Sequence, residues 1–256
     1  MNFFTGGLIA AELRRALLQP GCPICRIRDE AERRYLRSLL WEHVSDPATR
    51  AHIRASMGYC SAHTWQMGWM EVHGFGSALG NSTIYADLVG IVHGRLSRYL
   101  RGMLDGRPPT RLQQWARWAG GHWTRRDAVL GSRKGCRVCQ IGAQAESSHV
   151  YWLLQGLSQP DLPFSAWYGN PGMLCLHHLS RALEWGKADA QAGTVYLVAQ
   201  AVEYLEHLEA DLLGFGGKHA WDRRHERMTP AEKESWRNAL AFFGGSERSE
   251  GERTQV

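Results

Sequence analysis

Apolar residues recur at every third or fourth position along most of the chain, which is the spacing of an amphipathic helix. The clearest example follows Cys25, where charged side chains occupy mostly the opposite side of the predicted helix. No strand-like alternation of useful length appears. The pattern therefore predicts an all-α protein. The apolar positions of this first helix are Ile27, Ala31, Tyr35, Leu36, Leu39 and Leu40.

Capping residues mark where two further helices begin. Asp46-Pro47 places an N-cap carboxylate before a proline at the first helical position, and Gly58 suits a left-handed residue at the end of that helix. Thr229-Pro230-Ala231-Glu232 has the pattern of a capping box, so we expect a last helix to begin there. The apolar residues of that helix are Trp236, Leu240 and Phe243.

Two long helices are predicted, at about 77–104 and at about 188–213. Both have apolar residues at helical spacing, so that one face of each is apolar. The faces consist of Ile84, Leu88, Val92, Leu96, Leu100 and Met103 in the first helix, and of Val195, Val198, Val202, Leu205, Leu208 and Leu212 in the second.

The chain contains an internal duplication. Gly21-Cys22-Pro23-Ile24-Cys25 recurs 114 residues later as Gly135-Cys136-Arg137-Val138-Cys139, and Tyr59–His63 recurs 115 residues later as Leu174–His178. All six cysteines fall on matched positions, and almost nothing is inserted between them. Such self-similarity predicts two pseudo-symmetric helical repeats.

The duplication also predicts the organisation of the chain. The first and second repeats each contain one Cys-x2-Cys pair and one Cys-x2-His pair, and a basic, tryptophan-rich connector separates them. A polar tail at the end is expected to be disordered. The predicted boundaries are 1–106 for the first repeat, 107–134 for the connector, 135–217 for the second repeat, 218–243 for a basic segment with the last helix, and 244–256 for the tail.

The spacing of cysteine and histidine is typical of a metal site. Two cysteines separated by two residues can direct both sulfurs at one ion from a tight turn, and a second short-spaced pair completes a tetrahedron. Zinc prefers such a set, and a Cys3His site is closed to substrate. We therefore expect two structural Zn²⁺ ions, one in each repeat. The expected ligands are Cys22, Cys25, Cys60 and His63 for one ion, and Cys136, Cys139, Cys175 and His178 for the other.

Other ligand choices and other chemistry remain open. His177 is an alternative to His178, but only His178 matches His63 in the repeat. Cys22-Pro23-Ile24-Cys25 also resembles a thioredoxin-type redox pair, although each cysteine pair has a distant Cys-x2-His of its own. Cys3His ligation also occurs in iron–sulfur clusters. Zinc, iron–sulfur clusters and redox-active thiols are thus the three interpretations, whereas disulfides are not expected in a reducing cytosol.

Glu32 and Glu146 are a further matched pair. Each could lie on a solvated helix face, or each could accept a hydrogen bond from the ring of a ligand histidine. In a third interpretation, the two carboxylates face each other between the repeats and serve as a general acid and a general base.

Positive charge is concentrated in the connector. The net charge of the chain is +5, and residues 107–134 carry seven basic side chains against the single acid Asp127. Interleaved arginine and tryptophan can bind a phosphate backbone and stack on bases, but the tryptophans could equally pack onto both repeats. Trp41 and Trp152 lie on helix faces and are expected in the core. The candidate partner-binding residues are Arg111, Trp115, Arg117, Trp118, Trp123, Arg125 and Arg126, with the Lys218–Arg227 segment as second choice.

These motifs resemble a known family. Gly21 to Leu40, Asp46-Pro47 and Gly58 to His63, together with their counterparts in the second half, are similar to a family of bacterial proteins of unknown function built on a doubled CPxC/CxxH unit. The chain departs from that pattern at Arg137 and His177, where the family often has proline. Neither departure removes an expected ligand. The resemblance implies the cysteine and histidine ligands and implies no activity.

The sequence favours a binding role over catalysis. It contains no glycine-rich phosphate loop, no nucleophile elbow and no His-Glu-x-x-His motif. The leading hypothesis is a non-enzymatic, zinc-stabilised helical scaffold for a protein or nucleic-acid partner. The alternative is an iron–sulfur or reactive zinc-thiolate protein that senses oxidants or transfers electrons. A cytoplasmic location without membrane contact is expected, because the N-terminus lacks the pattern of a secretion signal and no apolar run reaches about 18 residues.

Overall fold

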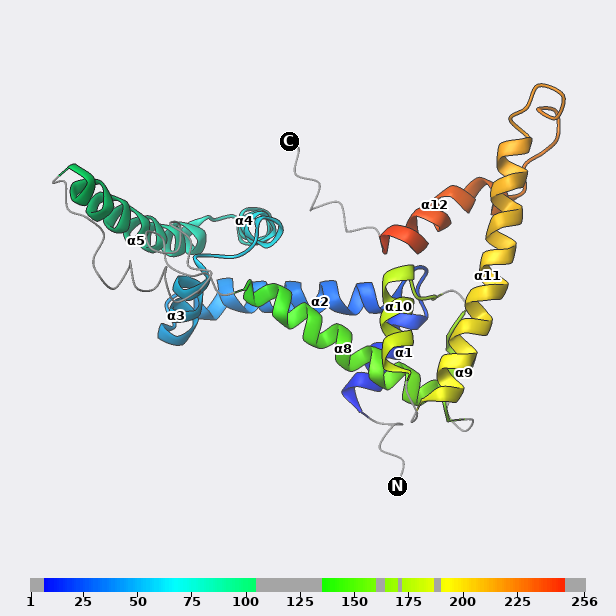
Figure 1. Ribbon diagram of the computed structural model, residues 1–256, viewed down its shortest axis with the longest axis horizontal. Coiled ribbons are helices and arrows are strands. Elements are labelled where there is room, and N and C mark those ends of the chain that lie inside the picture. The colour runs from blue at the N-terminus through cyan, green and yellow to red at the C-terminus, as the bar shows by residue number, and fades with distance from the viewer. Residues whose placement is uncertain (1–6, 105–134, 160–163, 170–171, 187–189, 247–256) are drawn as a thin grey trace. The chain divides into compact units, whose positions relative to one another are not determined.

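The structure is a computed structural model that describes residues 7–104, 135–159, 164–169, 172–186 and 190–246. Within these ranges the chain forms helices and no strand, so the all-α prediction is confirmed (Figure 1). The elements are α1 (Leu8–Leu17), α2 (Pro23–Ser38), a π-helical turn η1 (Leu39–His43), α3 (Pro47–Ser56), α4 (Ser61–Phe75), α5 (Leu79–Leu104), α8 (Arg137–Leu157), α9 (Phe164–Trp167), α10 (Leu176–Trp185), α11 (Gln191–Gly217) and α12 (Pro230–Gly244).

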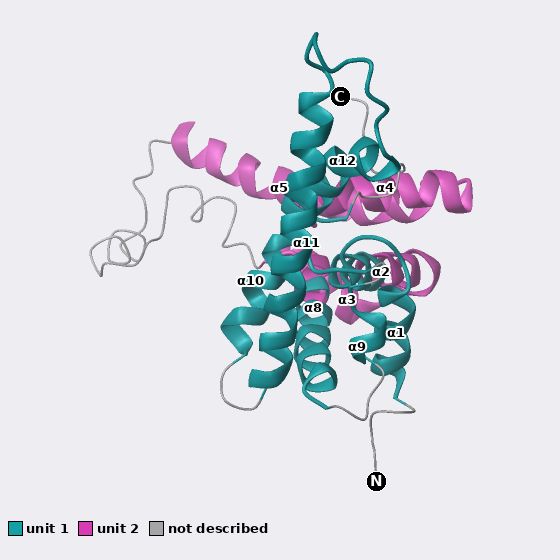
Figure 2. Ribbon diagram, turned by 90° about the vertical axis from the view of Figure 1, so that its right-hand side faces the viewer, with its two compact units in different colours: residues 1–31, 142–249 teal, residues 32–141, 250–256 magenta. Residues whose placement is uncertain are grey.

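The chain divides into two compact units (Figure 2). Unit 1 comprises residues 1–31 and 142–249, and unit 2 comprises residues 32–141 and 250–256. The division falls inside α2 and inside α8, so each unit contains parts of both sequence repeats. The boundaries of the units therefore differ from the boundaries of the sequence repeats. The predicted domain limits remain a prediction.

The core of unit 1 joins α1, the beginning of α2, α8, α9, α10 and α11. Two cysteines, Cys22 and Cys175, belong to this buried cluster. His149 of α8 connects to α1, because its Nε2 lies 3.0 Å from Oε2 of Glu12. The largest fully buried side chains of this unit are Leu13, Leu17, Ile24, Leu153, Leu154, Phe164, Leu174 and Leu197.

The core of unit 2 joins the end of α2, η1, α3, α4, the beginning of α5 and the beginning of α8. Its buried residues are Leu36, Leu39, Ile53, Tyr59, Met67, Ile84, Leu88 and Val138. Glu71 of α4 is also buried, and its carboxylate accepts hydrogen bonds from the backbone N–H groups of Gly80 (2.6 Å) and Asn81 (2.8 Å). It thereby satisfies donors that the first turn of a helix leaves free and holds α4 against α5.

The predicted helix boundaries are largely confirmed. Asp46 accepts a hydrogen bond from the Thr49 N–H at 2.7 Å, and Thr229 and Glu232 form the expected capping box. At the end of α3, Met57 adopts the left-handed conformation (φ 55°) together with Gly58 (φ 92°), so the left-handed turn begins one residue earlier than expected.

Side-chain burial departs from the predictions at several aromatic and apolar positions. Trp41, expected in the core, is 71% exposed. It lies in η1 and stacks on Phe75, which is itself exposed, with the ring centroids 5.8 Å apart, so the two rings cover each other at the surface. Trp152 does pack against the core of unit 1. In α12 the buried aromatic residue is Phe242, whereas Trp236 and Phe243 are exposed.

Candidate metal centres

The eight predicted ligands come together in two groups of four. Within each group, one ligand atom from every residue lies within 4.8 Å of the others. One group belongs to unit 1 and the other to unit 2. Site 1 consists of Cys22, Cys25, Cys175 and His178, and site 2 consists of Cys60, His63, Cys136 and Cys139.

The predicted pairing of ligands within one repeat is wrong. Each site combines the Cys-x2-Cys pair of one repeat with the Cys-x2-His pair of the other. The reason is the spacing along the helix that follows each cysteine pair. Cys25 and Glu32 are seven residues apart on α2, a rise of about 10 Å, and His63 contacts Glu32. The ring of His63 is thus held about two helical turns away from the cysteine pair of its own repeat.

Each half of a site is built in the same way in both repeats. Cys60 and Cys175 are the N-cap residues of α4 and α10, with almost identical extended backbone angles (φ −67°, ψ 166° and φ −72°, ψ 165°). The histidine three residues later lies in the first turn of the same helix, and Cys25 likewise lies in the first turn of α2. The ligands are therefore positioned by helix starts.

In both sites the three sulfurs surround Nδ1 of the histidine. In site 1, Nδ1 of His178 lies 3.4, 3.4 and 3.2 Å from the Sγ atoms of Cys22, Cys25 and Cys175. In site 2, Nδ1 of His63 lies 3.1, 3.5 and 3.3 Å from the sulfurs. The sulfurs of Cys25 and Cys175 lie 3.7 Å apart, and so do the sulfurs of Cys60 and Cys139.

These separations fit a single metal ion. Around a four-coordinate zinc ion, with zinc–sulfur bonds of about 2.3 Å, two sulfurs lie about 3.8 Å apart. All six cysteines are free rather than disulfide-bonded, so every sulfur remains a potential ligand. The donor set and its spacing therefore allow each group to bind a metal ion.

The other ring nitrogen of each histidine faces a buried carboxylate. Nε2 of His63 lies 3.0 Å from Oε2 of Glu32, which is only 2% exposed. Nε2 of His178 lies 3.6 Å from Oε2 of Glu146, which is 4% exposed. A solvated helix face is thus ruled out for both glutamates. Glu32 is positioned as an acceptor that orients a ligand imidazole, whereas Glu146 faces Nε2 of His178 beyond hydrogen-bond distance, and that nitrogen has no hydrogen-bond partner.

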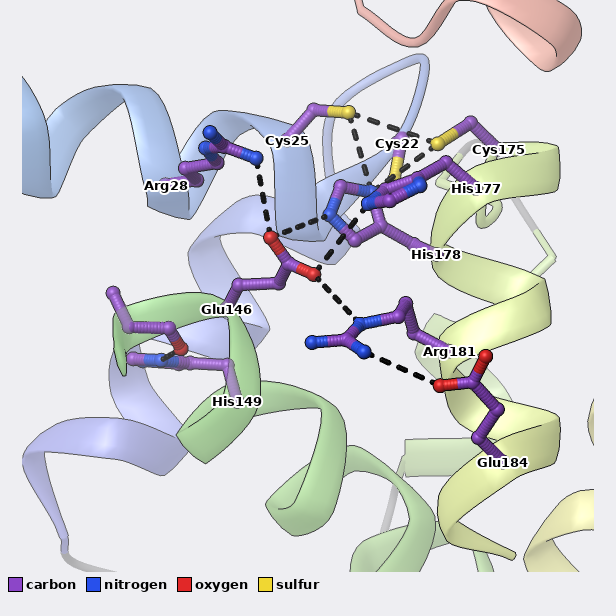
Figure 3. Close-up of polar contacts among 11 residues, drawn as sticks. Cys22, Cys25, Arg28, Glu146, His149, Cys175, His177, His178, Arg181 and Glu184 are labelled. Carbon is purple, nitrogen blue, oxygen red and sulfur yellow. Dashed lines mark hydrogen bonds and ion pairs between the residues drawn. The ribbon is translucent and has the colours of Figure 1, made fainter. Parts of the chain in front are cut away.

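Glu146 has more neighbours than its role beside His178 requires (Figure 3). Its carboxylate also lies 3.2 Å from Arg28, 3.4 Å from Arg181 and 3.6 Å from Nε2 of the exposed His177. His177 therefore faces the carboxylate, and His178 is the histidine that joins the cysteines, as the repeat register predicted. Arg181 was not anticipated, although it follows His178 by three residues and so shares its face of α10.

The crowding of ligand groups perturbs their pKa values in site 2. Burial lowers the pKa of His63, but hydrogen bonds to Cys136 and Glu32 outweigh it and raise that pKa to about 10. Burial raises the pKa of the Cys136 thiol, yet hydrogen bonds with His63 and with the backbone at Cys139 lower it to about 6. For Cys139, burial and a hydrogen bond to Cys60 raise the pKa to about 12.

Site 1 shows the same division among its thiols. Hydrogen bonds from Cys22 and Cys25 lower the pKa of Cys175 to about 3, whereas burial raises the pKa of Cys22 well above its usual value. In each site the pKa of one thiol is thus lowered and the pKa of another thiol is raised. A metal cation at such a site would displace the remaining thiol protons.

The comparison with known families places the chain in one family. A model for a family of unknown function, DUF6062, matches residues 17–248. The chain belongs to this family. The match includes all eight ligands, and it confirms the resemblance that the cysteine and histidine motifs indicated. No curated protein and no solved structure matches this DUF6062 chain.

The two sites of this DUF6062 protein differ in how deeply their ligands are buried. Three ligands of site 1 are buried, whereas His63 is the only buried ligand of site 2. The residues after α12 contribute to the cover of site 1. Ser246 donates a hydrogen bond to the Cys22 carbonyl at 3.2 Å, and a Cβ at Gly245 would lie 3.0 Å from the sulfur of Cys25. Gly245 also has φ 85°, so this position favours glycine for two reasons.

The structure describes only some of the predicted partner-binding residues. Arg111, Trp115, Arg117, Trp118, Trp123, Arg125 and Arg126 lie outside the described residues. In the second-choice segment, both carboxylate oxygens of Glu232 accept hydrogen bonds from Lys218 at 2.7 Å. Trp221 is exposed there, with the Arg224 guanidinium 3.5 Å from its ring centroid. No helix in the described part of the chain has the length and apolar character needed to cross a membrane.

Proposed function

We propose that this DUF6062 protein is a non-enzymatic helical scaffold, stabilised by two zinc ions, that presents a surface to a macromolecular partner. The observation that supports it most strongly is the convergence of three cysteine sulfurs and one histidine nitrogen in each site. Four protein ligands complete the tetrahedral coordination of zinc and leave no position for a substrate.

The choice of zinc rests on the donor set. Thiolate and imidazole are ligands that zinc favours, whereas calcium and magnesium prefer oxygen. In each site Nδ1 of the histidine faces the sulfurs and Nε2 faces a carboxylate. This is the usual arrangement around a zinc-bound histidine, because the carboxylate selects the tautomer and orients the ring.

Each ion would join parts of the chain that are distant in sequence. In site 1 it would link the beginning of α2 to the beginning of α10, and in site 2 the beginning of α4 to the residues that lead into α8. Because each site takes ligands from both repeats, metal binding would couple the folding of the two halves. A structural zinc site contributes on the order of 10 kcal/mol in small zinc-finger peptides.

The first test is elemental analysis of the purified protein with its ultraviolet–visible spectrum, both without exposure to air. We expect about two zinc ions per chain and no colour. Iron, together with a broad visible absorption band, would contradict the zinc scaffold and favour an iron–sulfur protein.

A further test concerns Glu32. The substitution Glu32→Ala removes the acceptor of the His63 N–H, so we expect the zinc affinity of site 2 to fall about 10- to 100-fold. Affinity is measured by competition with a chromogenic chelator. Glu30→Ala is the matched control, since Glu30 is an exposed acid on the same helix, and it should leave the affinity unchanged. Equal effects of the two substitutions would contradict a role for Glu32 in orienting the histidine.

The half-buried cysteines of site 2 favour a second candidate, a zinc-thiolate oxidant sensor. Hydrogen peroxide would oxidise two thiolates to a disulfide, be reduced to two hydroxide ions, and release Zn²⁺. Cys60 and Cys139 are suitable partners, because their sulfurs are 3.7 Å apart. Release of about one zinc with formation of this disulfide under mild peroxide would support the sensor. Full retention of zinc would support the purely structural role.

A further inference from the structure

Helix α5 has two distinct parts. Its beginning packs into the core of unit 2 through the buried residues Ile84 and Leu88. After Leu88 the helix contributes no buried residue, and Figure 1 shows its end extending past α3 and α4. Arg95 still contacts the end of α3, because it donates a hydrogen bond to Sδ of Met57 at 3.7 Å. Residues 89–104 therefore form a part of the helix that extends from the core.

One face of this second part is apolar and exposed. At about 100° per residue, the apolar side chains fall within about 60° of a common direction. They are between 46% and 77% exposed. We call this set the α5 apolar face; it consists of Val89, Leu96, Leu100, Met103 and Leu104. A continuous exposed apolar face on a helix is typical of a contact site.

The rest of the surface of residues 89–104 is basic. By helical spacing, Arg95 and Arg101 point about 120° to either side of the α5 apolar face, and Arg98 points about 180° away from it. The one acid of α5, Asp87, precedes this part and lies 2.7 Å from Arg54. The second part of α5 thus has an apolar face, a basic opposite side and no acidic residue.

Three glycines make this part of the helix depend on an external contact. Gly90, Gly94 and Gly102 lie on the side away from the α5 apolar face, and a Cβ at any of them would meet nothing within 4 Å. Close packing therefore does not require glycine at these positions. Glycine is less favourable than alanine inside a helix, because it loses more conformational freedom. A surface that covers the α5 apolar face would offset this cost.

These features are those of a helix that lies in the plane of a membrane surface. The apolar face of such a helix enters the boundary between headgroups and acyl chains by about 5–10 Å, and its polar side is rich in basic residues. Because an α-helix with its side chains is about 10 Å wide, its axis then lies among the headgroups. Side chains that point sideways, as Arg95 and Arg101 do, reach the lipid phosphates.

A partner helix fits the charges less well. In a helix pair, the residues that select the partner lie within about 90° of the centre of the apolar seam, at the e and g positions. The arginines of α5 lie outside that range. A bilayer is instead a broad negative surface, which attracts basic side chains on both sides of the helix over a distance of about 10 Å. A helix on the surface also needs no spanning segment, whose absence was the reason to expect no membrane contact.

We propose that residues 89–104 of α5 lie on an anionic lipid surface, with the α5 apolar face inserted and the flanking arginines at the phosphates. The contact is reversible, because a single amphipathic helix has a limited apolar area to bury. This inference goes beyond the scaffold role proposed above and does not depend on which metal the two sites bind.

Co-sedimentation of the full chain with lipid vesicles tests the proposal. Vesicles of phosphatidylcholine with about 30% phosphatidylglycerol are compared with vesicles of phosphatidylcholine alone. We expect the anionic vesicles to bind the protein at least about tenfold more tightly, and we expect this difference to shrink as salt is added. A protein that binds neither kind of vesicle would overturn the proposal, in favour of a protein contact that covers the α5 apolar face.

Leucine variants show whether α5 makes the contact, which matters because the connector is also basic and rich in tryptophan. Leu96→Gln/Leu100→Gln should weaken binding to anionic vesicles at least about tenfold, since both side chains leave the apolar boundary. Leu213→Gln/Leu240→Gln is the matched control, because these leucines of α11 and α12 are also exposed. The control should bind as the wild type does. Equal binding of the two double variants would overturn the proposal.

Charge reversals test how the helix is oriented on the lipid. Arg101→Glu should weaken binding to anionic vesicles about tenfold or more, whereas Arg98→Glu, on the side opposite the α5 apolar face, should weaken it less than about threefold. Equal effects would contradict insertion of that face. Circular dichroism checks that each variant keeps its helices. If the double leucine variant does not, Leu100→Gln replaces it and should weaken binding about threefold.

Discussion

The double variant Cys22→Ser/Cys175→Ser is expected to retain about one zinc ion per chain, whereas Cys22→Ser/Cys60→Ser is expected to retain almost none. The first variant removes two ligands from the same site and leaves site 2 complete. The second variant removes one ligand from each site. A Cys3His site that loses a thiolate loses most of its affinity, because serine is a poor zinc ligand.

Zinc content after dialysis against a mild chelator distinguishes these outcomes, with wild type as the reference at about two zinc ions per chain. The two variants remove the same number of cysteines, so each controls for general loss of thiols. Pairing within each repeat predicts the reverse result, since Cys22 and Cys60 would then share a site. A reversed zinc content would therefore refute the exchange of ligands between the repeats.

Removal of zinc by a strong chelator is expected to abolish the cooperative unfolding transition of the protein. Cys22 and Cys175 belong to the buried core of unit 1, and Cys136 packs against the core of unit 2. Loss of the metal therefore leaves unpaired thiols inside both cores in addition to removing the coordination bonds. The expected loss is on the order of 10 kcal/mol per site at neutral pH.

Urea unfolding followed by far-ultraviolet circular dichroism shows whether the cooperative transition is present. Addition of Zn²⁺ should restore the transition, and addition of Mg²⁺ should not, because magnesium requires oxygen ligands. The chelator should act more readily as the pH falls. The pKa of His63 is about 10 without metal, so protons compete for this ligand over the whole neutral range, and acid strengthens the competition. An unchanged transition after complete zinc removal would contradict a stabilising role for the metal.

Local features of the fold follow from the sequence because local interactions determine them. The capping residues Asp46 and Thr229 satisfy N–H groups within three residues, so their helices begin where the pattern predicts. Burial is less predictable. The apolar face expected for α5 is buried at Ile84 and Leu88 but exposed at Leu96, Leu100 and Met103, because periodicity shows that a face is apolar and not what covers it.

The sequence by itself determined the helical class, the duplication, and which cysteines and histidines could serve as ligands. Each of these rests on residue type and on spacing over a few turns. Only the tertiary structure decided how the ligands are grouped and that Glu32 and Glu146 are buried beside the histidines. The physical reason is the spacing along α2 and α8, in which Glu32 and Glu146 each follow the cysteine pair of their own repeat by seven residues. Seven residues of helix rise about 10 Å, so the histidine contact lies about two turns from the cysteine pair of the same repeat, and the partner ligands come from the other repeat.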